Sequence, residues 1–531
     1  MATLAAPPSQ LPQFVNELYA DFSQPEVAER AKQALAKVRS EFGKEYDLLI
    51  AGDRRRSTAK LNSLNPANPS QVIGIHQKGS EDDAREAIET AATYFPTWAA
   101  VPMEDRVRML VRAANILRER KFEFDAWLVV EAGKTWPEAE GEVAEAIDFC
   151  EYYARQALKL ANPEPTVQLS GERGEMIYLP LGVGVIIPPW NFPLAILAGM
   201  TVAALVVGNT VVVKPSSDTP TVASKFAEVL LEAGFPSQSF SLLTGSGASI
   251  GDVLVSHPKT RFVSFTGSRD VGLHINELAA KTPKGQLWIK RVVAEMGGKD
   301  AIVVDRETDI DKAVNGVVAS AFGYQGQKCS ACSRAIVDQS IYDEFVEKVK
   351  AKAQTLTVGA PEELGNYMGP VINERAKTSI LKYIDTGKSE GRLVAGGEAA
   401  PGDGYFVKPT VIADIGSKAR IFQEEIFGPV LAITKAKDFD HALELANDSE
   451  YGLTGAVFTD NPTKIEKAKE RFFVGNLYIN RKCTGAMVGA HPFGGFNMSG
   501  TDSKAGGPDY LLQFVQAKSI AEKVENPSGV Y

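Results

Sequence analysis

The chain has 531 residues, of which 44% are hydrophobic and 23% are charged, with a formal net charge of −9. This length is too great for one hydrophobic core, so we expect two or three domains, and the composition excludes a disordered or fibrous chain. The acidic balance, without a dense Lys/Arg block, argues against nucleic acid as a partner. Four cysteines are too few for a disulfide framework in so long a chain, which favours a cytoplasmic location.

The first part of the chain is predicted to be rich in amphipathic helices. Apolar residues recur at helical spacing over residues 26–42, as an amino-terminal helical extension, and again over 106–120 and 137–158. Ser80 followed by Asp83 has the spacing of a capping box, which indicates the start of another helix.

We expect neither an export signal nor a membrane span. The opening residues, MATLAAPPSQLPQ, lack a basic region followed by an apolar one. The apolar stretch 179–213 is long enough to raise a transmembrane alternative, but Pro188, Pro189, Pro193 and two asparagines interrupt it.

The middle of the chain alternates short apolar strands with helices. Strands are predicted at 183–187, 210–213, 239–243 and 261–265, after a β-hairpin within 166–180. Strand–helix–strand units joined by short turns form parallel sheets, which bind ligands at the carboxyl ends of their strands. The pattern therefore predicts an α/β fold with a nucleotide-binding crevice.

A second α/β series begins at Ala301 and predicts a second domain. Residues 342–356 have helical periodicity, whereas residues 392–411 and 428–434 are strand-like. No internal repeat or low-complexity tract is visible, which excludes solenoid and array architectures. The structure of residues 511–531 is not predicted.

Two glycine-containing turns follow predicted strands and open helices. One spans 244–251 and includes Gly247 and Gly251, and the other is FTGS at 265–268. Backbone amides at a helix start, together with the helix dipole, face anions such as a pyrophosphate. In the first turn the last glycine spacing is one residue longer than in the dinucleotide fingerprint, so ordinary glycine-rich turns remain the alternative.

Cys329 is the candidate nucleophile. It lies in the polar segment QGQKCSACSR at 325–334, which is unusual company for a core cysteine. A thiol must ionise to attack, and neighbouring amides, a helix start or Lys328 would promote this ionisation. One alternative is a small buried side chain, and another is a zinc or redox pair with Cys332. Because no second ligand pair exists and the histidines are scattered, no metal is expected.

Two polar residues are candidates for the chemistry around this thiol. Glu295 ends an apolar strand, where burial would raise the pKa of its carboxyl group and suit it to proton transfer. Asn191 lies between Trp190 and Phe192, where its amide should have a specific partner and would serve as an oxyanion donor. The alternatives are a surface carboxylate in a turn and a turn-forming asparagine.

Six motifs run through these candidates. They are PWNFP at 189–193, KPS at 214–216, FTGS at 265–268, EMGGK at 295–299, GQKC at 326–329 and EEIFGP at 424–429. In this order they resemble the aldehyde dehydrogenase superfamily, over about residues 61–520. The resemblance implies a Rossmann-type nucleotide domain interleaved with an α/β catalytic domain and a small β oligomerisation flap. The implied boundaries are 1–40 for the amino-terminal helical extension, 41–165 and 181–294 for the nucleotide-binding domain, 295–485 for the catalytic domain, and 166–180 with 505–531 for the flap and tail.

Further segments are similar to one branch of this family. They are WIKR at 288–291, FGYQGQKCS at 322–330, and NRKCTGA at 480–486 followed by PFGG at 492–495. That branch oxidises L-glutamate γ-semialdehyde, which forms from Δ1-pyrroline-5-carboxylate, to L-glutamate in proline breakdown. The resemblance thus implies an NAD-dependent enzyme with a small-molecule substrate.

The resemblance also assigns roles. Cys329 forms a thioester, Asn191 and the Cys329 amide hold the oxyanion, and Glu295 is the general base for hydrolysis. Lys214 would bind the adenosine ribose. The implied cofactor-binding residues are Ile187, Trp190, Lys214, Ser217, Gly247, Gly251, Phe265, Gly267, Ser268, Met296, Glu425 and Phe427. Ser217 replaces a glutamate common in NAD-selective members, which makes NADP an alternative cofactor.

Substrate binding is expected at a loop near Gly485. Its amide and that of Ala486, with the Ser330 hydroxyl, would form an anion nest for the substrate carboxylate, because no arginine is expected close to this loop. Phe192 and Phe493 would pack against the aliphatic middle of the substrate. The alternative is an ordinary glycine-containing turn.

Other functions remain open alternatives. They are a dehydrogenase for another semialdehyde or an aliphatic aldehyde, a cysteine hydrolase or thioesterase, and a non-catalytic binding protein on the same scaffold. An exposed flap needs a partner, so a homo-oligomer is expected, either a dimer or an assembly of dimers. Cys332 or Cys483, if close to Cys329, would form an inactivating disulfide under oxidation.

Overall fold

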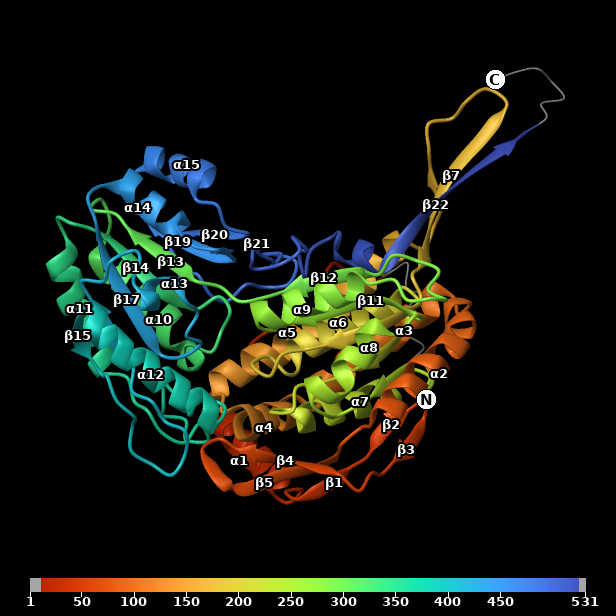
Figure 1. The fold of residues 1–531 in the computed structure, drawn as a ribbon, viewed down its shortest axis with the longest axis horizontal. Helices are drawn as coiled ribbons and strands as arrows, with labels where there is room; N and C mark the ends of the chain where they lie inside the picture. The colour runs from red at the N-terminus through yellow and green to blue at the C-terminus, as the bar shows by residue number, and fades with distance from the viewer. Residues whose placement is uncertain (1–10, 525–531) are drawn as a thin grey trace.

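The computed structural model describes residues 11–524. Residues 1–10 of the expected extension, which include most of the segment considered as an export signal, and residues 525–531 of the expected tail lie outside this range. Two α/β lobes lie side by side, and a β arm projects from one of them (Figure 1). Each lobe is built around one large sheet.

The first lobe contains a seven-stranded sheet among the described residues. In spatial order its strands are β12 (Arg291–Glu295), β11 (Thr260–Thr266), β8 (Val183–Ile187), β9 (Thr210–Val213), β10 (Phe240–Leu242), β2 (Leu48–Ile50) and β3 (Asp53–Arg55). The first five strands are parallel to one another, β2 is antiparallel to β10, and β3 is antiparallel to β2. The register pairs Phe265 with Ile187 and Thr266 with Glu295. The carboxyl ends of three parallel strands therefore meet at one edge, where such a sheet binds ligands.

The strand predictions for this lobe are confirmed with shifts of one residue at most. The strands expected at 183–187 and 210–213 have those bounds, and β10 and β11 differ from expectation only at their ends. The capping box is also confirmed, because the Ser80 hydroxyl accepts from the Asp83 amide while the Asp83 carboxylate accepts from the Ser80 amide at 2.8 Å.

The second lobe contains another seven-stranded sheet within the described range. Its order is β15 (Arg392–Ala395), β16 (Thr410–Ala413), β17 (Val430–Ala436), β14 (Cys332–Asp338), β13 (Asp300–Val304), β19 (Thr454–Phe458) and β20 (Asn476–Ile479). Only β15 is antiparallel to its neighbour. The expectation of strand over all of 392–411 is wrong, since only its two ends are strands. Gly396 and Gly397 adopt positive φ at the first break, which an extended strand does not allow.

The helices agree closely with the predicted runs. The extension, 106–120, 137–158 and 342–356 correspond to α1, α3, α5 and α11. The α-helices are α1 (Pro25–Arg39), α2 (Glu81–Ala99), α3 (Met103–Glu119), α4 (Lys121–Ala132), α5 (Trp136–Lys159), α6 (Ala195–Val206), α7 (Pro220–Ala233), α8 (Asp252–Ser256), α9 (Arg269–Ala280), α10 (Ile310–Phe322), α11 (Tyr342–Gln354), α12 (Glu374–Glu390), α13 (Arg420–Gln423), α14 (Phe439–Asn447) and α15 (Pro462–Arg471). Shorter turns are η2 (Gly247–Gly251, a π-helix), η3 (Gly323–Gly326) and η4 (Tyr510–Phe514).

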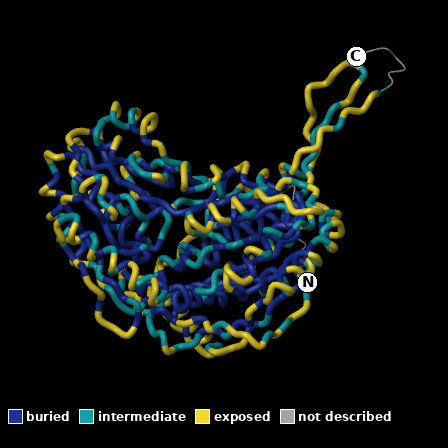
Figure 2. Tube along the Cα trace, in the orientation of Figure 1, coloured by how far each residue is buried: buried dark blue, intermediate teal, exposed yellow. Residues whose placement is uncertain are grey.

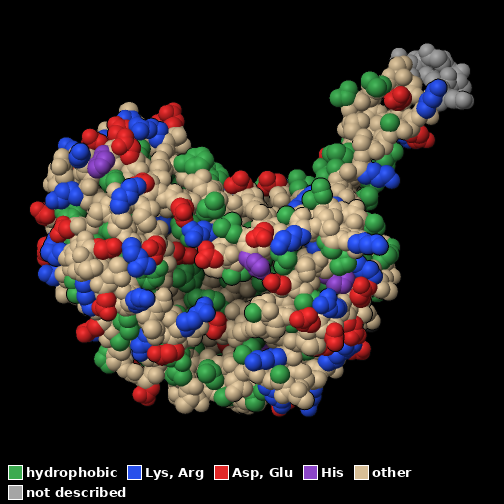
Figure 3. Space-filling view, in the orientation of Figure 1, with side chains coloured by type: hydrophobic (Ala, Val, Ile, Leu, Met, Phe, Trp, Pro, Cys, Tyr) green, Lys and Arg blue, Asp and Glu red, His purple; other side chains and the backbone are tan. Residues whose placement is uncertain are grey.

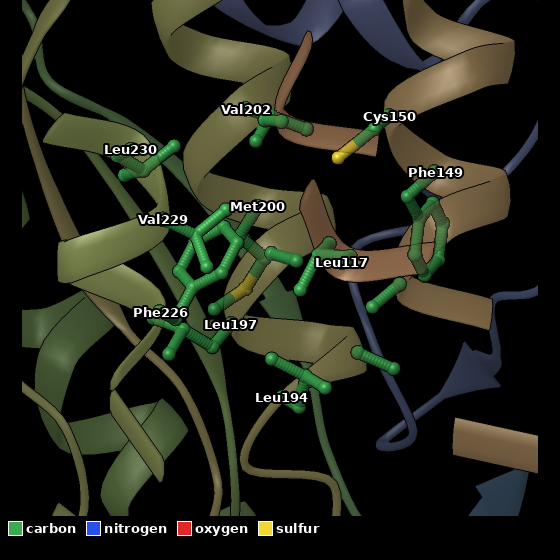
Figure 4. Close-up of a cluster of buried hydrophobic side chains, with 14 of the residues drawn as sticks. Leu117, Phe149, Cys150, Leu194, Leu197, Met200, Val202, Phe226, Val229 and Leu230 are labelled. Atoms are coloured by element: carbon green, nitrogen blue, oxygen red, sulfur yellow. The ribbon is translucent and has the colours of Figure 1, made fainter. Parts of the chain in front are cut away.

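The core of the first lobe is centred on α6. This helix, AILAGMTVAALV, is apolar on all sides and buried almost throughout, as expected of a helix with protein on every face. Leu197 and Met200 of α6 lie in one cluster with Leu117 of α3, Phe149 of α5 and Phe226 of α7 (Figure 4). The loop before α6 carries Asn191, so this packing anchors one side of the site.

The projecting arm pairs two distant parts of the chain. β22 (Val515–Lys523) runs antiparallel to β7 (Glu172–Pro180), whereas β6 (Glu164–Pro165) contributes only two residues. The expected hairpin within 166–180 is confirmed in part, because the chain turns back from β6 into β7 and the Thr166 amide donates to the Gly174 carbonyl at 3.3 Å, but the longer partner of β7 is the distant strand β22. The arm is largely exposed along its length (Figure 2). The smaller sheets join β1 (Lys44–Tyr46), β5 (Asn68–Gln77) and β4 (Lys60–Asn65), and β18 (Tyr451–Gly452) with β21 (Phe496–Asn497).

No helix within residues 11–524 is both long enough and apolar enough to cross a membrane. Basic and acidic side chains are intermixed over the face drawn in Figure 3.

Candidate active site

Cys329 lies on a turn whose unusual backbone is fixed by a buried glutamine. Between α10 and β14, Tyr324, Gln325 and Gly326 all have positive φ, at 50°, 56° and 67°. The Gln325 amide nitrogen donates to the carbonyls of Gly133 and Pro370 at 3.1 and 2.7 Å, and its oxygen accepts from the Gly369 amide at 3.0 Å. Backbone in such sparsely populated conformations persists only when its surroundings hold it. The turn presents Cys329 in a half-buried position, whereas the other three cysteines are buried.

Asn191 is bonded to this same turn. Its side-chain nitrogen donates to the carbonyl of Gln327 at 2.9 Å, and the residue is only 4% exposed. This contact joins the loop between β8 and α6 to the segment two residues before Cys329. This bond uses one of the two hydrogens of the Asn191 side-chain amide. The second hydrogen is left to donate to the oxygen of a carbonyl group that the thiol attacks, which becomes negative.

Glu295 ends β12 and is held by two donors. The Ser503 hydroxyl donates to one carboxylate oxygen at 2.7 Å, and the Gly495 amide to the other at 3.3 Å. Burial is the largest influence and raises the pKa of Glu295 to about 8, against these hydrogen bonds, which lower it. A carboxyl group with this pKa can exchange a proton near neutral pH, as a general base must. Sequence reasoning missed Ser503 and Gly495, which lie about 200 residues away along the chain.

The electrostatics of Cys329 differ from expectation. Burial raises the pKa of the thiol well above its ordinary value, and the carboxyl groups of Asp300, Glu425 and Glu295 raise it further. Lys328, suggested as a promoter of the thiolate, instead forms an ion pair with Glu138 of α5 at 2.6 Å. The free thiol is therefore held neutral, and its activation requires a base or a change in the surrounding charge.

The predicted cofactor residues near the sheet edge do come together. Lys214 ends β9, is 6% exposed and donates to the Pro215 carbonyl at 3.1 Å, and burial lowers its pKa to about 8. The Ser217 hydroxyl donates to the Gly245 carbonyl at 3.2 Å, which ties the turn after β9 to the turn after β10. That second turn leads through Gly247 into η2 and α8. Consecutive turns thus line the carboxyl edge of the sheet.

The turn after β11 lies beside Glu295. Phe265 lies in β11 and Gly267 directly follows this strand, and the Gly267 amide donates to the Glu295 carbonyl at 3.0 Å. Ser268 precedes α9 and is exposed, so the amides at the start of that helix are accessible. Met296 donates its amide to the Ser499 carbonyl at 2.7 Å.

Glu425 and Phe427 lie opposite the first lobe. A Glu425 carboxylate oxygen accepts from the Gly298 amide at 3.0 Å, and burial raises the pKa of this carboxyl group to about 7. A Cβ on Gly297 would come within 2.2 Å of Glu425, so only glycine allows this approach. The Phe427 ring meets Trp190 edge-on at 5.4 Å between ring centroids. A cavity of about 10 Å³, the size of one water molecule, lies between this turn and the turn that carries Cys329.

Phe192 is held by a buried charge that sequence reasoning missed. The ammonium group of Lys134 lies 3.8 Å from the centre of the Phe192 ring and 4.0 Å from that of Tyr324. Lys134 pairs with Glu142 at 2.9 Å, and both side chains are fully buried. Glu142 also accepts from the backbone amide of Leu194 at 2.8 Å, which fixes the loop after Asn191. No local sequence pattern reveals such a pair, since Lys134 lies in the short connection between α4 and α5 and Glu142 lies within α5.

The remaining predicted substrate residues come from two loops. The Ser330 carbonyl accepts from the Cys483 thiol at 3.3 Å, which brings Ser330 beside the loop that carries Gly485 and Ala486. Phe493 exchanges two backbone hydrogen bonds with Ala505, each 2.8 Å long. The first contact places Ser330 beside the loop of Gly485 and Ala486, and the second places Phe493 beside Ala505.

The expectation that no arginine lies near Gly485 is wrong. The Arg481 guanidinium donates to the carbonyls of Thr484 and Gly485 at 3.2 and 3.1 Å. Gly485 has a φ of +76°, so the chain turns back on itself and brings the earlier residue close. Only the proximity of Arg481 in sequence could have signalled this contact.

The remaining cysteines and the potential metal ligands were also candidates for the site. The Cys332 thiol donates to the Arg334 carbonyl at 3.4 Å, and all four cysteines are free. Within the part of the chain that the structure describes, no group of three or more His, Cys, Asp or Glu side chains is arranged to hold a metal ion.

Comparison with known proteins gives a consistent result. The sequence model of the aldehyde dehydrogenase family matches residues 54–520. A 1-pyrroline-5-carboxylate dehydrogenase of Geobacillus thermodenitrificans is 56% identical over 96% of this chain and 99% of its own, and one of Bacillus subtilis is 54% identical with the same coverage. The crystal structure of a 1-pyrroline-5-carboxylate dehydrogenase from Thermus with bound NAD superposes with a TM-score of 0.95 at 48% identity, covering 97% of this chain and all of that one. The predicted family and fold class are thus confirmed, and the chain belongs to the aldehyde dehydrogenase family.

Proposed function

We propose that this protein oxidises L-glutamate γ-semialdehyde, the open form of Δ1-pyrroline-5-carboxylate, to L-glutamate with NAD in proline breakdown. One observation carries the catalytic part of the proposal. Asn191 is hydrogen-bonded to the turn that carries Cys329, and the buried carboxylate of Glu295 raises the pKa of that same thiol. The names of relatives that are more than half identical over nearly the whole chain support the substrate.

The residues present fit a dinucleotide. The buried ammonium of Lys214 bonds to a backbone carbonyl at the carboxyl edge of the parallel sheet, where a ribose hydroxyl would accept from it. Gly297 leaves the space that a Cβ would fill beside Glu425. Lys214, the Gly267–Ser268 turn, Glu425 and Phe427 would hold NAD, which supplies the hydride acceptor when bound. Ser217 carries no negative charge to repel a 2′-phosphate, so NADP is tested beside NAD.

The chain's own residues account for the other steps. The Cys329 sulfur, once deprotonated, attacks the aldehyde carbon, and the Asn191 amide and the Cys329 backbone amide stabilise the oxygen that becomes negative. Loss of hydride from that carbon leaves a thioester on Cys329. Glu295 then takes a proton from water as the water attacks the thioester, which releases the acid and restores the thiol.

The substrate's amino-acid end would lie against the loop of Gly485 and Ala486. Their amides and the Ser330 hydroxyl would bind the carboxylate, while Phe192 and Phe493 would pack against the methylene groups. Arg481 lies behind this loop and bonds to its carbonyls, which holds the amides in place.

The experiment that tests the proposal follows absorbance of reduced nicotinamide with purified protein. NAD and NADP are compared for glutamate semialdehyde, succinic semialdehyde and hexanal, with the Cys329→Ala variant as control. Selective turnover of glutamate semialdehyde that the variant loses is the expected result. Turnover of only the other aldehydes would overturn the substrate, and no nicotinamide reduction would leave the hydrolase alternative.

We further propose a cytoplasmic homo-oligomer, a dimer or an assembly of dimers, divided into the domains expected from the sequence. The β arm supports this, because it carries exposed apolar side chains at Val167, Leu169 and Leu179, of which Val167 is 90% exposed. Light scattering after size exclusion should give a mass of at least two chains. A monomer at micromolar concentration would contradict the assembly.

A further inference from the structure

Residues 11–24, here called the amino-terminal arm, contain neither helix nor strand but are fastened to α5 and its neighbours. Arg155 donates to the Pro12 carbonyl at 2.8 Å, and Lys121 donates to the Leu18 carbonyl at 2.7 Å. The amide of Ala20 donates to the Glu140 carboxylate at 2.6 Å. Bonds to successive parts of the arm give it one fixed course, although it has no regular structure.

Asn16 connects this arm to a third segment. Its side-chain nitrogen donates both to the Asp148 carboxylate of α5 at 2.8 Å and to the Val488 carbonyl at 2.9 Å. The Glu17 amide donates to the other Asp148 oxygen at 2.7 Å, so the position of Asn16 is set from two sides. Asn16 therefore ties Val488 to the rigid helix.

Phe14 makes a second contact with the same segment. Its ring meets that of Tyr152 edge-on at 5.1 Å between centroids. A Cβ on Gly489 would lie 3.1 Å from Phe14 and 3.0 Å from Tyr152, so the Gly489 backbone packs directly against both rings. Because Gly489 has a φ of +78°, a side chain here would strain both the packing and the backbone.

Val488 and Gly489 belong to the loop that carries Gly485 and Ala486. Apart from the arm, residues 484–491 are held by the buried side chain of Val488 and by a bond from the Gly489 amide to the Gly506 carbonyl at 2.9 Å. Arg481 bonds to the Gly485 carbonyl, and the His491 ring accepts from the Met487 amide at 3.2 Å. A loop without ladder hydrogen bonds takes its position from such tethers. The arm supplies two of them, at Val488 and Gly489, which lie two to four residues from the amides expected to bind substrate.

We propose that the amino-terminal arm positions the carboxylate-binding loop, with Phe14 and Asn16 as positioning residues for recognition of the substrate's amino-acid end. The assignment of this end rests on the proposed function. Loss of either tether would let the loop shift, weakening its hydrogen bonds to a carboxylate without altering Cys329, Asn191 or Glu295. Specificity, rather than the chemical step, is what the arm governs.

The test compares Asn16→Ala and Phe14→Ala with Ser23→Ala, a control in the exposed part of the same arm, whose hydroxyl contacts only Asp21. For each tether variant we expect the KM for glutamate semialdehyde to rise about tenfold, roughly the effect of weakening one or two hydrogen bonds. The kcat, the KM for NAD and the kinetics with hexanal, which has no carboxylate, should stay within twofold. Equal losses with both aldehydes, or an unchanged KM in both variants, would overturn the proposal.

Amide hydrogen exchange of residues 484–491 provides a readout that does not depend on the substrate. Exchange in this loop should quicken in Asn16→Ala and Phe14→Ala but not in Ser23→Ala. If the wild-type protein fails to oxidise glutamate semialdehyde while the exchange responds in this way, the proposed function falls and the link between arm and loop stands. Unchanged exchange in both variants removes the link.

Discussion

Replacing Ser503 with alanine should raise the pKa of Glu295, the proposed general base, without removing a residue expected to bind the substrate. The Ser503 hydroxyl is buried and donates to Glu295 at 2.7 Å, which stabilises the ionised form against the opposing effect of burial. Alanine removes this donor and leaves only the longer bond from the Gly495 amide. The pKa of Glu295 should therefore rise above its value of about 8.

The size of the change follows from the bond that is lost. A hydrogen bond to a charged group contributes about 1.5–3 kcal/mol, and about 1.4 kcal/mol corresponds to one pH unit, so the midpoint should move upward by about one to two units. With a pKa near 8, roughly a quarter of Glu295 is ionised at pH 7.5, and after the shift about 3% or less is ionised. Hydrolysis of the thioester at that pH should slow about tenfold or more.

The assay is rapid mixing of enzyme, NAD and aldehyde across pH 6–10. Formation of the thioester gives a burst of reduced nicotinamide, and the slower phase that follows reports hydrolysis where hydrolysis limits turnover. The burst should be similar in both proteins, while the midpoint of the slow phase moves upward in Ser503→Ala. Ser499→Ala is the matched control, since Ser499 is buried nearby but its hydroxyl accepts from Gly452 and not from Glu295. An unchanged or lowered midpoint in Ser503→Ala would refute the assignment of Glu295 as the base.

Three other predictions concern stability and reactivity. Burial raises the pKa of Glu295 from 4.5 to about 8, so between these pH values the carboxyl group ionises more readily in the unfolded chain, and the folded state loses stability as the pH rises. The Tm of Glu295→Gln relative to that of the wild type should therefore increase from pH 5 to pH 9. A constant difference in Tm would contradict this. Lys134→Met leaves Glu142 as a buried charge without its partner, and urea unfolding should show a loss of about 3–5 kcal/mol, against less than about 1 kcal/mol for Lys37→Met, because Lys37 is 61% exposed and its partner Glu123 keeps a second ion pair with Arg120. A thiol reagent should react with one cysteine in the native protein, Cys329, since the other three are buried. This reaction should be faster at higher pH, because the pKa of the Cys329 thiol is raised, and it should be absent in Cys329→Ala. Rapid reaction of several thiols would contradict the burial of the other three.

The sequence could predict those features that depend on local pattern. The strands at 183–187 and 210–213, the Ser80 cap and the helix over 137–158 follow from periodicity and capping chemistry, which act over a few residues. The edge of the sheet that carries Glu295 follows from the alternation of strands and helices. The roles expected of Cys329, Asn191 and Glu295 came from family motifs and stay predictions until the variants are measured.

The features that were missed depend on contacts between distant segments. The longer partner of β7 is β22, and no pattern within 166–180 indicates that this distant strand joins the local hairpin of β6 and β7. The donors to Glu295 and the pairing of Lys134 with Glu142 likewise arise only when the chain is folded. For Lys328 the error was to infer a contact from nearness in sequence. It lies next to Cys329 in the chain and was expected to promote the thiolate, but its ammonium group pairs with Glu138 instead.

The order in which the chain is made gives the long-range support of Glu295 a further meaning. Glu295 leaves the ribosome before either of its donors, the nearer of which lies 200 residues later. β7 is likewise made long before β22, so it waits as an unpaired edge while both lobes are being built. Contacts of such separation form late in folding. The support of the Glu295 carboxylate is therefore acquired late in synthesis, because a nascent chain with both large sheets complete still lacks the hydrogen bonds from Gly495 and Ser503.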